Sequence, residues 1–172
     1  WFESQLHAVL ATFDPARPVF TEAESRRIGL VSLPNELIER MRAAPCLRID
    51  ASVAARTDFL LRDYDYLTSD AEALIAELER LTDLRGHDTI GAWSALARAG
   101  DWRTLVAALL EQHYDPLYRR SQQYNFARHP NAPTFEADRL DAAGIDALAA
   151  RIIRTTAQGT FDDVSAHTAQ MR

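Results

Sequence analysis

Lysine is absent from this chain of 172 residues, because its 19 basic residues are all arginine. A phosphate-binding loop of the GxxxxGK[ST] type needs a lysine that reaches the terminal phosphates, so this chain cannot supply one. For the same reason no side chain can form a Schiff base with a carbonyl substrate. The six glycines are scattered and form no phosphate cradle.

Cysteine is also scarce. The single Cys46 excludes an internal disulfide, and its position at the start of the apolar run CLRIDA favours a buried structural thiol over a nucleophile. The five histidines lie far apart in the sequence and lack the spacing of metal ligands. Since the chain shows neither a signal-peptide pattern nor a long apolar run, we expect a cytoplasmic protein with no membrane partner.

The net charge of -6 and the sequence pI of about 5.3 limit the partners further. A surface of this charge does not attract polyanions as a whole, so contact with RNA would need a local patch of arginines. The length suffices for one domain with a hydrophobic core, or for one domain with an appended helical subdomain. An amphipathic helix pattern starts at Phe2 without a capping residue, and from this we expect a fragment of a longer chain.

The apolar pattern of residues 1–68 predicts an α/β domain. Helices are expected over residues 2–13, 34–44 and 53–67, and strands over residues 19–21 and 47–51. Alternation of helices and strands is typical of a parallel sheet with crossover helices. The fold class is therefore α/β, with part of a P-loop NTPase-like parallel sheet and helices dominating overall.

Residues 69–133 predict a mostly α-helical subdomain. Apolar stripes recur at helical spacing, Ser69 and Glu72 form a capping box, and Gly86 and Gly100 stand where helices end. Residues 126–133 are expected to form a loop. In the last segment, residues 134–172, we expect a strand over 134–140, a helix over 142–155 capped by Asp141, and a tail that frays.

The first candidate site is the segment PVFTEAESRRIGLVSLP, residues 18–34. Val19 and Phe20 predict a buried strand, and charged residues follow directly where that strand would leave the sheet. Open α/β sheets bind ligands at this position. Glu22 and Glu24, two residues apart, could share a metal ion, a water molecule or an arginine. The alternative is a charged turn in solvent.

The second candidate site is YDPLYRRS, residues 114–121. Asp115-Pro116 is expected to break the helix, and the residues around it offer ring faces, hydroxyls and two cations. Such a set could clamp a diphosphate or stack a base. A helix junction with buried tyrosines and solvated arginines is an equal alternative. Arg56 is a weaker candidate for contact with phosphate.

Four motifs in order resemble the C-terminal part of bacterial tRNA 2-selenouridine synthase. They are FESQL, then EAESRRIG followed by LP and a Met-bearing helix, then AARTDFLLRDY, and finally HYDPLYRRS. The resemblance runs in register from Phe2 to about Ser121 and is weaker through the closing strand and helix. Cys46 matches no position of the family's essential cysteine.

The resemblance implies an enzyme that geranylates the wobble 2-thiouridine of tRNA with geranyl diphosphate and then replaces sulfur with selenium from selenophosphate. Its partners would be tRNA, an N-terminal rhodanese-like domain and a P-loop segment, and the fragment alone is expected to be inactive. Glu22 or Glu24 would hold Mg²⁺. Within this family, charge and residue type suggest the following roles: catalysis for Glu22, Glu24 and Arg26; phosphate or RNA contact for Ser25, Arg27, Arg56, Arg119 and Arg120; and nucleoside or prenyl contact for Tyr114 and Tyr118.

Two other functions stay open at this point. One is a non-catalytic helical adaptor that binds a protein partner through its apolar stripes and through Trp93 and Trp102. Such an adaptor would leave both tryptophans exposed, whereas an enzyme would bury them. The other is a fragment of a P-loop small-molecule kinase with an arginine-bearing lid.

Overall fold

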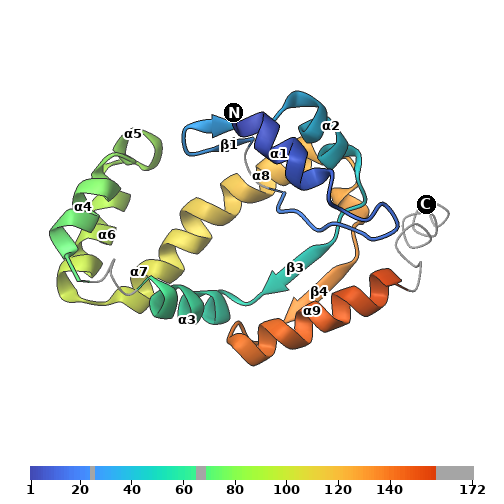
Figure 1. Cartoon of the computed structure of the whole chain (residues 1–172). Coiled ribbons are helices and arrows are strands. Elements are labelled where there is room, and N and C mark those ends of the chain that lie inside the picture. Colours follow the sequence, from blue (N-terminus) through green and yellow to red (C-terminus); the bar gives the residue numbers. More distant parts are fainter. Residues whose placement is uncertain (24–25, 65–68, 158–172) are drawn as a thin grey trace. The chain divides into compact units, whose positions relative to one another are not determined.

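Helices dominate the computed structural model, which describes residues 1–23, 26–64 and 69–157 (Figure 1). The α-helices are α1 (Phe2–Leu10), α2 (Asn35–Ala43), α3 (Val53–Asp63), α4 (Ala71–Glu79), α5 (Thr82–Arg85), α6 (His87–Ala99), α7 (Trp102–Leu109), α8 (Asp115–Asn125) and α9 (Ala142–Ala157). The strands are β1 (Arg27–Ile28), β2 (Val31–Ser32), β3 (Arg48–Ala51) and β4 (Thr134–Ala137). A π-helix covers Leu110–Tyr114 and a 3₁₀ turn covers His129–Asn131.

The chain forms two compact units that interleave in sequence. Unit 1 contains residues 1–48, 121–134 and 151–172, and unit 2 contains residues 49–120 and 135–150. Within unit 2, α3 packs against α7.

The best-buried part of unit 2 is a cluster of apolar side chains from three helices. Its members are Ile75 and Leu78 of α4, Ile90, Trp93 and Ala97 of α6, and Leu105 of α7. Their spacing of three and four residues puts them on one face of each helix, as the sequence predicted. Trp93 is 2% exposed, and Trp102 packs partly buried against the same cluster. This burial contradicts an adaptor that would use both tryptophans as its contact surface.

The helix ends of unit 2 follow the predicted glycines but not the predicted capping box. Gly100 ends α6 in the left-handed conformation with φ 71°, and Gly86 separates α5 from α6 with φ 83°. The start of α4 lies one residue later than expected, because the carboxylate of Asp70 accepts a 3.0 Å hydrogen bond from the Ala73 N–H. Asp70, and not Ser69, is therefore the N-cap residue.

The sheet is small and its main strand pair is parallel. β3 pairs with β4, and their arrows point the same way in Figure 1. In β4 the buried side chains alternate with exposed ones, so one face of the strand is covered. Both strands lie within the ranges predicted, which confirms the α/β class with a partial parallel sheet. The helix following β4 is capped by Asp141, as expected, through a 2.9 Å hydrogen bond from the Gly144 N–H.

The prediction of a strand at residues 19–21 is wrong. Val19 and Phe20 are 54% and 51% exposed and belong to no strand, and the first strand, β1, starts at Arg27. A strand needs a neighbour for its backbone N–H and C=O groups, and an apolar run does not reveal whether one exists.

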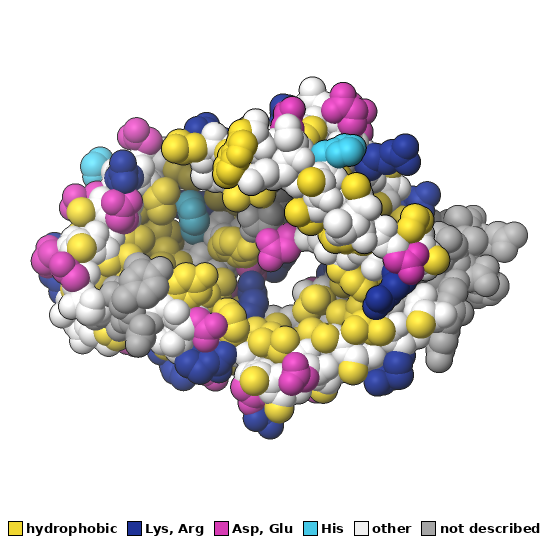
Figure 2. Space-filling view, viewed as in Figure 1, with side chains coloured by type: hydrophobic (Ala, Val, Ile, Leu, Met, Phe, Trp, Pro, Cys, Tyr) yellow, Lys and Arg dark blue, Asp and Glu magenta, His cyan; other side chains and the backbone are white. Residues whose placement is uncertain are grey.

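The charged residues that were expected to follow a strand instead precede a tight antiparallel hairpin of β1 and β2. Ile28 pairs with Val31, and the positive φ of Gly29, 59°, suits the first position of the two-residue turn. Ile28 and Leu30 are exposed, and hydrophobic side chains are visible over the hairpin in Figure 2.

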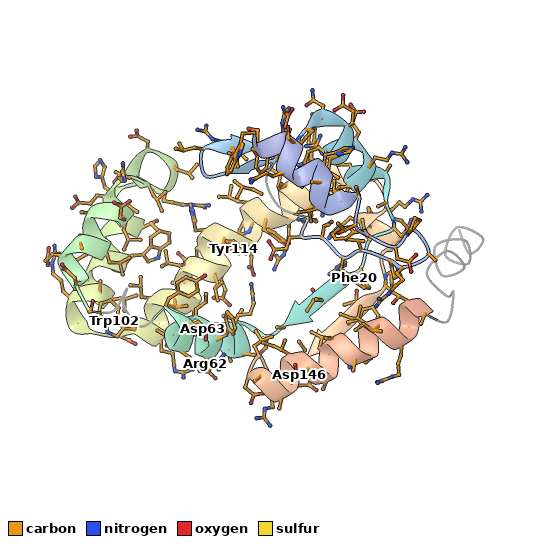
Figure 3. All side chains as sticks on the ribbon, viewed as in Figure 1. Phe20, Arg62, Asp63, Trp102, Tyr114 and Asp146 are labelled. Carbon is orange, nitrogen blue, oxygen red and sulfur yellow. The ribbon has the colours of Figure 1, made fainter. Side chains whose placement is uncertain are left out.

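Arg62, near the C-terminal end of α3, ties that helix to the loop before α9 (Figure 3). Its guanidinium donates a 2.9 Å hydrogen bond to the Leu140 carbonyl and lies 5.3 Å from the centre of the Phe59 ring. The loop then passes close to the first turn of α9. A Cβ atom on Gly144 would lie 2.4 Å from the Arg139 carbonyl oxygen, so only glycine fits there.

We expect Gly144→Ala and Gly91→Ala to change stability in opposite directions. A methyl group at Gly144 would collide with backbone, so the free energy of unfolding should fall by about 1–3 kcal/mol. Gly91 is exposed inside α6 with open space around it, and alanine there should raise the free energy by about 0.5–1 kcal/mol. Urea unfolding of both variants tests this, and equal shifts would contradict the close approach at Arg139.

Candidate functional site

The sequence analysis predicted a helix break at Pro116, and this prediction is wrong. α7, the π-helix and α8 follow one another without interruption from Trp102 to Asn125 (Figure 1). In the π segment the Asp115 N–H donates to the carbonyl of Leu110, five residues earlier. Proline lacks the N–H of an α-helical bond and crowds the carbonyl four residues before it. The wider π turn just before Pro116 accommodates this, so the chain continues as a helix.

Asp115 is the centre of the polar cluster at this junction. It is 7% exposed, and its two carboxylate oxygens accept hydrogen bonds of 2.6 and 2.9 Å from Arg56 of α3. Arg119, one turn further along α8, donates a third bond of 3.3 Å. A two-pronged arginine–carboxylate pair fixes both side chains in orientation. Arg56, a weaker candidate in the sequence analysis, is thus fixed by two hydrogen bonds to a buried carboxylate.

The charges in this cluster stabilise one another. The hydrogen bond from Arg56 holds the pKa of the Asp115 carboxyl below its ordinary value, and Arg119 acts in the same direction. The pKa of Arg56 is raised, chiefly by the bond to Asp115, with smaller contributions from Tyr114 and Asp50. Both groups therefore stay charged at neutral pH. The buried Nε of Arg56 has no hydrogen-bond partner among the described residues.

Tyr114 and Tyr118 form a stacked pair on either side of Asp115 in the sequence. Their ring centres lie 5.3 Å apart and their planes differ by 15°. The residues are 46% and 38% exposed, so the pair is neither core nor fully solvated. Tyr114 is labelled on this helical run in Figure 3. The sequence left open whether these tyrosines were buried in a helix junction, and their exposure contradicts that alternative.

A second contact at the π-helix holds His113. Arg85 of α5 donates a 2.9 Å hydrogen bond to Nδ1 of His113, and the His113 ring meets Trp93 edge to face at 6.4 Å. Because Nδ1 accepts this bond, the imidazole is neutral with its proton on Nε2. Burial and the nearby Arg85 cation lower the pKa of His113.

The residues of the EAESRR segment belong to unit 1, and the cluster around Asp115 belongs to unit 2. Glu22, Arg26 and Arg27 are exposed, and Arg27 donates a 3.0 Å hydrogen bond to the Gly29 carbonyl within the hairpin. Glu24 and Ser25 lie outside the described residues. The Leu33 N–H donates a 2.9 Å hydrogen bond to the Arg26 carbonyl, which closes the base of the hairpin.

Arg120 is exposed on α8 and forms no hydrogen bond or ion pair with the described residues. Cys46 is half-buried, and burial raises the pKa of its thiol, which suits a structural cysteine and not a nucleophile. Within the described ranges, no helix is long and apolar enough to cross a membrane.

Sequence reasoning missed Asp115 and the pair formed by Arg85 and His113. Asp115 was interpreted only as part of a helix break, although its spacing of four residues from Arg119 is typical of a helical ion pair. No local signal marks the bond from Arg56, because 59 residues separate it from Asp115.

We expect Asp115→Asn to destabilise the chain far more than Asp58→Asn. Removing the Asp115 charge leaves the partly buried Arg56 cation without its counter-ion, which should cost about 2–3 kcal/mol. Asp58 forms an exposed pair with Arg103, whose loss should cost about 0.5 kcal/mol. Chemical denaturation of both variants measures the difference, and similar costs would show that the buried pair does not hold the junction.

We expect stability to fall as the pH drops from about 7.5 to 5, partly through His113. The folded state lowers the pKa of His113 below the unfolded value of 6.5, so the unfolded chain binds a proton that the folded chain resists. The contribution of His113 to stability is therefore fully present above the unfolded pKa of 6.5 and decreases as the pH falls below it. His113→Gln should flatten this slope in urea titrations at several pH values. His87→Gln removes an exposed histidine outside this cluster and serves as the control.

Comparison with known proteins adds independent findings. A family model described as the AAA domain of tRNA 2-selenouridine synthase matches residues 1–88. The tRNA 2-selenouridine synthase of Alcanivorax borkumensis is 25% identical, with 83% of this chain and 46% of that protein aligned. Those of Bordetella petrii and Cupriavidus pinatubonensis are 31% and 29% identical, over 62% and 65% of this chain and 37% and 38% of those proteins. No solved structure matches.

The chain spans less than half the length of these curated relatives. An AAA domain is a P-loop-type α/β fold, in agreement with the parallel pair β3–β4 and its surrounding helices. The family match also decides against a small-molecule kinase. Over residues 1–88, half of its length, the chain matches the AAA-domain model of the tRNA 2-selenouridine synthases, and it belongs to that family.

Proposed function

We propose that this chain is part of an enzyme that converts the wobble 2-thiouridine of tRNA into 2-selenouridine. In this proposal the sulfur is first geranylated from geranyl diphosphate and is then replaced by selenium from selenophosphate. Membership of the synthase family supports the modification of tRNA. The reaction steps and the co-substrates come from the family resemblance of the four sequence motifs.

One observation of unit 2 carries the proposal that the chain contacts an anionic substrate. Asp115 orients Arg56 and Arg119 at one helix junction, and Arg120 adds a third cation on the same helix as Arg119. Arginines held in this way offer N–H donors in fixed directions to phosphate oxygens. In a chain of net charge -6, such a local patch is what contact with RNA or a diphosphate requires.

We propose that the segment of residues 22–27 takes part in the transfer of the geranyl group. Arg26 would neutralise charge on the departing diphosphate, and Ser25 and Arg27 would contact phosphate or RNA. Glu22 or Glu24 would bind Mg²⁺ accompanying the diphosphate. Among the described residues no three metal-ligating side chains cluster, so most of the ion's ligands would be phosphate oxygens and water, as is usual for Mg²⁺.

We further propose that the 172-residue chain alone does not catalyse the reaction. It has no lysine, so the phosphate-loop lysine of the family's domain has to come from a P-loop segment outside this sequence. The rhodanese-like domain that carries the family's essential cysteine would be a second partner.

We expect Arg26→Ala, in a longer protein that includes this chain and the rest of the family's length, to slow geranyl transfer by about 10²-fold. Lysine should restore the rate only partly, because it keeps the charge but loses the fork. Arg17→Ala, which removes another exposed arginine of unit 1, is the matched control. Single-turnover geranylation of a 2-thiouridine tRNA, with a thermal melt of each variant, provides the measurement. If Arg26→Ala transfers geranyl at the wild-type rate and melts at the wild-type temperature, Arg26 has no role in the reaction.

A further inference from the structure

The stacked tyrosines of unit 2 present an aromatic surface next to oriented cations. Tyr114 and Tyr118 lie nearly parallel, and together they keep a large part of their surface exposed. Aromatic pairs in a hydrophobic core bury almost all of this area, because burial is what makes them stabilising. Here the core tryptophan, Trp93, is 2% exposed, whereas the two tyrosines are 46% and 38% exposed.

The cations beside this pair are fixed by the same carboxylate. Asp115 lies between the two tyrosines in sequence and holds Arg56 by two bonds and Arg119 by one. The Arg119 side chain is 72% exposed, so most of its donors face solvent. Arg119 and Arg120 directly follow Tyr118 on α8, so two exposed cations lie on the helix that bears the stack.

We propose that the Tyr114–Tyr118 stack binds an unpaired nucleobase of RNA, with Arg119 and Arg120 contacting the adjoining phosphates. This inference rests on the proposed function, since it names the part of the substrate that this site contacts. Single-stranded RNA is recognised by aromatic faces that stack on bases beside cations that bind the backbone. A prenyl chain fits less well, because its hydrocarbon would strip water from exposed guanidinium groups next to the rings.

The test measures base-dependent binding to the 172-residue chain. The probe is a fluorescent oligouridylate of about ten nucleotides, compared with an abasic ribose-phosphate chain of equal charge, in about 50 mM salt. Wild type should bind the oligouridylate about tenfold more tightly than the abasic chain. Tyr118→Leu should abolish this difference while keeping the weaker, charge-dependent binding, and Tyr118→Phe should retain it because the ring remains.

Tyr124→Leu is the matched control, since Tyr124 is an 88% exposed tyrosine of the same helix for which no ring partner is found among the described residues. It should bind like wild type. Tryptophan emission and a thermal melt check that each variant is folded. The proposal is overturned by equal binding of the two probes to wild type, by no binding of either, or by an effect of Tyr124→Leu equal to that of Tyr118→Leu. Binding of geranyl diphosphate that depends on Tyr118, without base-dependent RNA binding, would assign the stack to the prenyl chain and also overturn it.

The two proposals fail separately. Turnover of 2-thiouridine tRNA by the longer protein, without base-dependent binding by this chain, would remove only the stacking role. Base-dependent binding that requires Tyr118, together with no conversion of tRNA by the longer protein, would leave the stack in place and refute the proposed reaction.

Discussion

The geometry of unit 2 depends on one buried carboxylate. A charged group at 7% exposure is tolerated only when it is paired, and Asp115 meets this condition with three hydrogen bonds from two arginines. The bond to Arg56 connects the start of α8 with the first turn of α3. Because α3 also packs on α7, this pair and the apolar contacts hold the same two segments together. The packing of α3 on α7 therefore helps to fix the orientation of Arg56.

The π-helix decides which way three consecutive side chains point. His113 meets Arg85, Tyr114 stacks on Tyr118, and Asp115 meets Arg56. In a π segment each turn contains an additional residue compared with an α-helix, so the faces of the following residues are rotated. Pro116 gives the physical reason for this irregular turn, and π segments of this kind are frequent at functional sites. The feature that was expected to end the helix instead arranges the candidate site.

The two candidate sites differ in what supports them. The site in unit 2 is supported by hydrogen bonds, ring contacts and burial among described residues. The segment with Glu22 and Arg26 is supported by family membership and by charge, since it lies within the matched residues 1–88 and forms part of an exposed hairpin region. Each unit thus contributes a different kind of observation to the same proposed reaction.

The sequence determined most of the helices and their apolar faces, because these depend on neighbours within a few residues. The stripe through Ile75 and Leu78 and the glycine after α6 are local signals of this kind. The motifs also determined the family. Only the tertiary structure decided that Val19 and Phe20 form no strand, since pairing requires a partner that a local pattern does not show. It alone showed that Arg56, a weaker candidate from the sequence, pairs with Asp115, because this ion pair spans 59 residues and exists only after α3 and α8 come together.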